Sequence, residues 1–169
     1  MVTKEIKDML EAQLNREIAS SYLYMALCMK CKVINFEGAA HWFRLQSIEE
    51  LTHAEKLINY LTMQGEEVVL DKIDKPVVTG STLLDFYTQT NQHEQFVTKC
   101  IHELTAAARA CNDFSTEALM HWFISEQVEE EANVVDIISK LKLIGNDGSN
   151  LYLIDKELAS RQPPAATAG

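Results

Sequence analysis

The chain has 169 residues, of which 47% are hydrophobic, enough for one domain with a complete core. Acidic residues number 25 against 15 basic ones, so the formal net charge is −10. This balance disfavours nucleic acid or an anionic membrane as the main partner. The sequence contains no apolar run of about 18 residues, which is the length that would predict a membrane span. Residues 1–8 lack the apolar segment of a secretory signal, so we expect a cytoplasmic protein.

Glycine and proline cluster at a few breaks, and the pattern between the breaks is helical almost throughout. We predict helices at about 4–34, from a turn near 35–36 to about 64, from 81–82 to 111–112, and at about 115–144. Gly65 is a plausible helix stop, and Ser81 and Thr82 are good N-caps. A short fifth helix should be capped by Ser149 and carry Tyr152, Ile154 and Leu158. Residues 1–161 then form a single domain, and we expect 162–169 to be disordered.

The connection at about 66–80 determines the predicted topology. The two other connections between long helices are tight, so each joins an antiparallel hairpin. A 28-residue helix is roughly 42 Å long, and about 15 extended residues reach roughly 50 Å. The connection can therefore run the length of the bundle and make its flanking helices parallel. This predicts an all-α, ferritin-like four-helix bundle with a long crossover.

Each of the four long helices carries a glutamate on its apolar stripe. These residues are Glu17, Glu50, Glu94 and Glu130, and His53 follows Glu50 by three positions. A buried carboxylate is costly unless it is paired, hydrogen-bonded or bound to a metal. Measured from turns near residues 35 and 113, all five side chains lie within about three residues of one level, or about 5 Å. The pattern predicts a metal site inside the bundle.

Oxygen ligands with one imidazole suit Fe(II) better than zinc. Glu50 and His53 form an E-x-x-H, which places both on one helical face. Two irons fit if Glu50 bridges them, with Glu17 and His53 completing one position and Glu94 and Glu130 the other. Gln127 is a neutral hydrogen-bonding group that we place in this site, where it would hold water or a bound oxygen species.

Several neighbours of these ligands allow two interpretations. Tyr24 lies two turns after Glu17 and either donates a hydrogen bond or an electron near the metals or is a core tyrosine. Trp122 allows the same two interpretations. Glu49, Glu126 and Glu129 form either a solvated acidic face or an accessory metal site. We interpret the remaining histidines and the four cysteines as structural or exposed; these residues are His41, His93, His102, His121, Cys28, Cys31, Cys100 and Cys111.

The ligand pattern resembles that of bacterial non-haem ferritin across nearly the whole chain. The residues that carry the resemblance are Glu17, Tyr24, Glu50, His53, Glu94, Glu126, Gln127, Glu129 and Glu130. The resemblance implies a 24-subunit shell that oxidises Fe(II) with oxygen or hydrogen peroxide at a ferroxidase centre and stores ferric mineral. It also implies a third iron site built from Glu49, Glu126, Glu129 and Glu130, and a fifth helix that lines a fourfold axis.

Related families fit the sequence less well. Bacterioferritin would carry a second E-x-x-H, where this chain has Gln127 and Glu130, and a haem-ligating methionine, where it has Leu51. We therefore expect no haem. Rubrerythrin needs a rubredoxin cysteine set, and mini-ferritins lack the fifth helix. The alternative is a small-oligomer di-iron oxidase or peroxidase without mineral storage; a metal-free structural bundle would leave the buried carboxylates unexplained.

Overall fold

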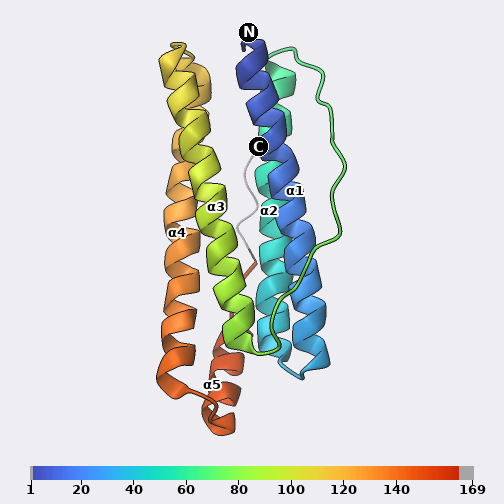
Figure 1. The fold of residues 1–169 in the computed structure, drawn as a ribbon, viewed down its shortest axis with the longest axis vertical. Coiled ribbons are helices and arrows are strands. Elements are labelled where there is room, and N and C mark those ends of the chain that lie inside the picture. Colours follow the sequence, from blue (N-terminus) through green and yellow to red (C-terminus); the bar gives the residue numbers. More distant parts are fainter. Residues whose placement is uncertain (1, 164–169) are drawn as a thin grey trace.

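The computed structural model describes residues 2–163, which form five helices and confirm the predicted all-α bundle (Figure 1). The helices are α1 (Lys4–Val33), α2 (Glu37–Met63), α3 (Leu83–Ala110), α4 (Phe114–Ile144) and α5 (Gly148–Leu158). α1 and α2 form one hairpin, α3 and α4 form the other, and the long connection runs beside α1 along the bundle (Figure 1). None of the helices in this described part is long and apolar enough to cross a membrane.

The helix ends follow from local chemistry. Thr82 caps α3 in a capping box with Asp85, as its position before an apolar stripe predicts. Gly65 has φ +80° directly after the end of α2, which is the left-handed conformation of a helix terminator. The tight turns of both hairpins use asparagine in the same conformation, Asn35 at φ 63° and Asn112 at φ 59°.

The start of α5 differs from the prediction. Its N-cap is Asp147, whose carboxylate accepts the backbone N–H of Asn150 at 2.9 Å, and Ser149 lies inside the first turn. Gly145 is the C-cap of α4, with φ +61°. α5 already begins at Gly148, so the residue before it, Asp147, is the N-cap. Of the predicted disordered tail, residues 162–163 are described and 164–169 lie outside the described residues.

The bundle core consists of two apolar clusters with a polar layer between them. One cluster lies towards the Asn35 turn and includes Phe43 and Tyr87, and the other lies towards the opposite end and includes Leu14 and Phe123. The buried carboxylates and the buried histidine come from all four long helices and lie between these clusters. An apolar core interrupted in this way positions a polar site in the middle of the molecule.

Candidate metal centre

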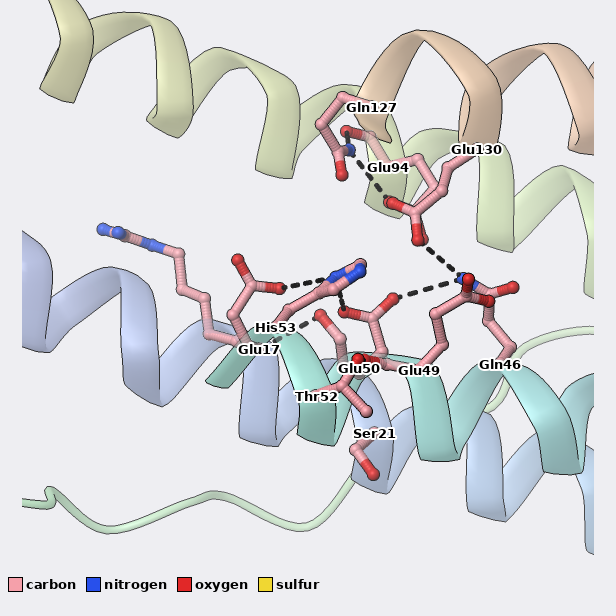
Figure 2. A network of polar contacts seen from close by, with 12 residues as sticks. Glu17, Ser21, Gln46, Glu49, Glu50, Thr52, His53, Glu94, Gln127 and Glu130 are labelled. Carbon is pink, nitrogen blue, oxygen red and sulfur yellow. Dashed lines mark hydrogen bonds and ion pairs between the residues drawn. The ribbon is translucent and has the colours of Figure 1, made fainter. Parts of the chain in front are cut away.

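The polar layer contains the five side chains that the apolar stripes single out (Figure 2). α1 contributes Glu17, α2 contributes Glu50 and His53, α3 contributes Glu94, and α4 contributes Glu130. Their exposed fractions lie between 1% and 8%. The structure therefore brings together, in one buried place, groups from sequence positions more than a hundred residues apart.

These five side chains fall into two groups that share Glu50. One group is Glu17, Glu50 and His53, and the other is Glu50, Glu94 and Glu130; in each, one ligand atom per residue lies within 4.8 Å of the others. His53 Nδ1 lies 3.9 Å from Glu17 Oε2 and 3.6 Å from Glu50 Oε2. Carboxylate and imidazole ligands in this arrangement suit a pair of divalent transition-metal ions bridged by one carboxylate.

Crowding of carboxylates changes their protonation in the metal-free protein. Burial raises the pKa of Glu17 and Glu130 well above the usual range, and the neighbouring Glu50 raises both further. Burial also raises the pKa of Glu94, to about 7. Burial opposes ionisation of Glu50 as well, but the hydrogen bond and charge of His53 outweigh it and lower its pKa. Bound protons thus reduce the negative charge of this cluster.

Two carboxylate oxygens of the site lack any hydrogen-bond partner within the described chain. They are Glu17 Oε2 and Glu130 Oε2, and both atoms are inaccessible to solvent. Buried polar atoms are rarely left unsatisfied, because the desolvation cost is then uncompensated. One of these atoms belongs to each group, which is the arrangement expected if each group binds a cation.

Two glutamines that the sequence reasoning did not single out hold the carboxylates in place. Gln13 Nε2 donates to Glu17 Oε1 at 2.7 Å. Gln46 Nε2 lies 3.3 Å from Glu50 Oε1 and 3.0 Å from Glu130 Oε1, so one amide connects the two hairpins (Figure 2). Each glutamine precedes a ligand by four residues, the spacing that places two side chains on one helical face. That spacing is the signal that could have identified them.

Tyr24 and Gln127 both contact Glu94. Tyr24 is fully buried and its hydroxyl donates to Glu94 Oε1. Gln127 Nε2 lies 3.1 Å from Glu94 Oε2 and 3.2 Å from Thr98 Oγ1. Both side chains therefore orient this carboxylate from outside the two ligand groups.

The acidic residues Glu49, Glu126 and Glu129 lie outside the buried groups. Together with Glu130 they line a cavity of about 440 Å³ that also reaches His53. Glu49 and Glu126 are half-buried and Glu129 is exposed. The cavity therefore connects these acidic side chains with two of the buried side chains, His53 and Glu130.

Trp122 and Arg161 also line this cavity. The indole of Trp122 packs edge-on against His53 with ring centroids 5.4 Å apart. Arg161 forms an ion pair with Glu49 at 2.6 Å. Arg161 could not be identified from the sequence, because it follows the fifth helix and no periodic pattern links it to the site.

The other histidines lie outside both ligand groups. His93 bonds to Ser20 Oγ at 2.7 Å, His41 bonds to a backbone carbonyl at 3.0 Å, and the remaining two are exposed. Within the described residues all four cysteines are free thiols. Burial raises the pKa of Cys31 to about 12, so this thiol stays protonated and belongs to the core.

Comparison with known proteins points to one family. The family model for the ferritin-like domain matches residues 7–144 of the sequence. The bacterial non-heme ferritin of Escherichia coli O6:H1 is 39% identical over 160 residues, which cover 95% of this chain and 97% of the relative. That of Campylobacter jejuni is 37% identical over 156 residues, covering 92% and 93%.

Solved structures agree with this relationship. An open-pore ferritin from Archaeoglobus fulgidus superimposes with a TM-score of 0.94 at 38% identity, covering 96% of this chain and all of the other. A form of that ferritin closed by site-directed mutagenesis has the same TM-score and identity. With a bundle of this topology and a carboxylate–histidine cluster at its centre, the chain belongs to the ferritin family.

Proposed function

We propose that the protein oxidises Fe(II) at the two buried ligand groups and stores the Fe(III) product as a mineral inside a hollow shell of identical subunits. The observation that carries this proposal is the pair of groups that share Glu50, with one unsatisfied oxygen in each. Such a pair holds two metal ions close enough to deliver electrons together to oxygen or hydrogen peroxide.

The residues of the chain have distinct roles in this proposal. Glu17, Glu50 and His53 bind the first Fe(II), and Glu50, Glu94 and Glu130 bind the second. Tyr24 and Gln127 orient Glu94, and Tyr24 is placed to supply a proton or an electron close to the second ion. Glu49, Glu126 and Glu129 form an accessory cation site with Glu130 on the route through the cavity.

The proposed assembly has 24 copies of the 19.1 kDa chain, roughly 460 kDa in total. The related Archaeoglobus protein is described as an open-pore ferritin, which supports a shell. A di-iron oxidase that stores no mineral would require only a small oligomer, so light scattering on the purified protein separates the two functions.

The test of the site is an anaerobic Fe(II) titration followed by exposure to oxygen, with absorbance recorded over time. We expect a fast phase that oxidises two Fe(II) per chain, one for each group, and then slower mineral growth. His53→Ala should remove the fast phase, whereas His102→Ala, on an exposed position of α3, should leave it intact. A fast phase that survives His53→Ala contradicts the site, and one without mineral growth favours the small oxidase.

A further inference from the structure

The cavity outside the metal centre contains a positive charge supplied by the C-terminal segment. Among the described residues that line it, Arg161 alone carries a permanent positive charge. Four acidic residues line the same cavity, namely Glu49, Glu126, Glu129 and the buried Glu130. A cation that enters therefore meets a site in which a guanidinium is already present.

Arg161 is held there by four contacts. Its Nη2 lies 2.6 Å from Glu49 Oε2, and its Nη1 donates to the carbonyl of Trp42 at 3.2 Å. The guanidinium carbon lies 4.6 Å above the Trp42 ring, and the Arg161 carbonyl is 3.0 Å from Nε2 of His41. The two side chains of the ion pair are only 22% and 21% exposed. Such a partly buried, hydrogen-bonded pair is stronger than a typical surface ion pair.

The position of Arg161 follows from the way α5 docks on α2. Asp155 of α5 accepts the backbone N–H groups of Gly38 at 3.0 Å and Ala39 at 2.8 Å, in the first turn of α2. A Cβ at Gly38 would lie 1.7 Å from the carbonyl oxygen of Asp155, so only glycine permits this approach. α5 ends at Leu158, and three residues later the chain reaches the cavity. The fold thus directs this side chain to Glu49.

We propose that Arg161 is a gate residue: its guanidinium occupies the cation position at Glu49 in the metal-free protein, and a divalent cation entering the accessory site displaces it. This rests on the accessory site of the proposed function. Displacement breaks the guanidinium contacts to Glu49 and Trp42, so residues 159–162 are held to α2 less tightly. The buried groups carry displaceable protons but no guanidinium, so only the accessory site bears the cost of breaking this ion pair, and we expect it to be the weaker site.

The first test is calorimetric titration of the assembled protein with Fe(II) under anaerobic conditions. Arg161→Met keeps an apolar stem over Trp42 but removes the charge. It should tighten the weakest class of Fe(II) sites about tenfold, the factor expected for one charged hydrogen bond. Arg161→Lys keeps the charge, so the Fe(II) affinity of its weakest class of sites should equal that of the wild type.

Two controls make this result specific. Arg109→Met removes an exposed arginine that is paired with Glu117 at 2.6 Å, away from the cavity, and should change nothing. In a Glu49→Gln background, Arg161→Met should not change the Fe(II) affinity, because the carboxylate for which Arg161 and the cation compete is absent. Equal Fe(II) affinity of the wild type and Arg161→Met in the weakest class would overturn the gate.

Hydrogen exchange provides a second readout that does not depend on a variant that folds. In the wild type, saturating Zn²⁺ should accelerate amide exchange in residues 159–162, while α5 itself keeps its protection. Unchanged exchange in this segment would mean that Arg161 is only a structural clamp and would overturn the proposal. A wild type that binds no Fe(II) would instead refute the proposed function, and the Zn²⁺ experiment would still decide the gate.

Discussion

Glu94 connects the chemistry of the metal centre to pH. Burial raises its pKa from 4.5 to about 7, so between these values the folded chain binds more protons than the unfolded chain. The unfolding free energy of the metal-free protein therefore falls as pH rises through this window. A cation bound at Glu94 would have to displace the same proton, so its binding should strengthen as pH rises across this window.

We therefore expect the metal-free protein to be more stable at pH 5 than at pH 7.5, with Glu94 alone contributing up to about 3 kcal/mol per chain. Denaturant unfolding at the two pH values measures the difference. Glu94→Gln should remove its own share of this dependence and leave the share of Glu17 and Glu130, whereas Glu103→Gln, at an exposed position of the same helix, should preserve all of it. A stability of the metal-free wild type that rises across the window would contradict the assignment.

Gln46 offsets part of the cost of burying these carboxylates, because its amide is close enough to donate hydrogen bonds to both Glu50 and Glu130. Gln46→Leu retains the volume but removes the donor to Glu50 and Glu130. It should lower the unfolding free energy of the metal-free protein by about 1–3 kcal/mol, the range for hydrogen bonds to charged groups.

Bound Zn²⁺ should reduce the effect of Gln46→Leu, because the cation then neutralises the same two carboxylates. Unfolding with and without Zn²⁺ tests both statements. Gln92→Leu, on the exposed face of α3, provides the control. If metal-free Gln46→Leu has the same unfolding free energy as the metal-free wild type, the amide does not stabilise the site.

The difference between what could and could not be predicted from the sequence is visible in single residues. Glu17 and Glu94 stand out because each interrupts an apolar stripe, which needs only helical periodicity. Gln46 lies on a similar stripe, but a buried amide costs less than a buried carboxylate and gives a weaker signal. Arg161 gives no signal, because its contact with Glu49 depends on the angle at which α5 packs.

At the scale of helices, α5 supplies the N-terminal cap of α2. Phe36 at the N-cap of α2 makes no side-chain hydrogen bond, and Asp155 of α5 satisfies the first-turn N–H groups instead. A carboxylate at a helix N-terminus is also favoured by the helix dipole. The fifth helix could be predicted from its apolar residues, but this capping contact depends on the packing of two distant segments.

Gly38→Ala tests this contact between helices. The added methyl group would overlap the backbone of Asp155, so α5 must move away from α2 and the cap must be lost. We expect a loss of about 1–2 kcal/mol of unfolding free energy, the upper range for a lost N-cap. Gly148→Ala, where an added Cβ meets no atom within 4 Å, should be neutral by comparison. Equal stability of the two variants would show that α5 is not docked through Asp155.

At the scale of the whole molecule, the two ligand groups differ in what they connect. Glu17, Glu50 and His53 all belong to the hairpin of α1 and α2, so a cation bound to them stays within that hairpin. The second group takes Glu50 from this hairpin and Glu94 and Glu130 from the other. A cation would therefore cross-link the two halves of the bundle only if it bound to the second group.

Hydrogen exchange with and without Zn²⁺, which binds both imidazole and carboxylate, tests this division. In the wild type we expect slower exchange near the site in all four long helices, because a ligand that binds only the folded state opposes its opening. His53→Ala weakens the first group and should retain the protection of α3 and α4. Glu94→Gln weakens the second group and should confine protection to α1 and α2. If both variants lose protection in the same helices, the two groups bind cations as one cooperative unit rather than as separate sites joined through Glu50.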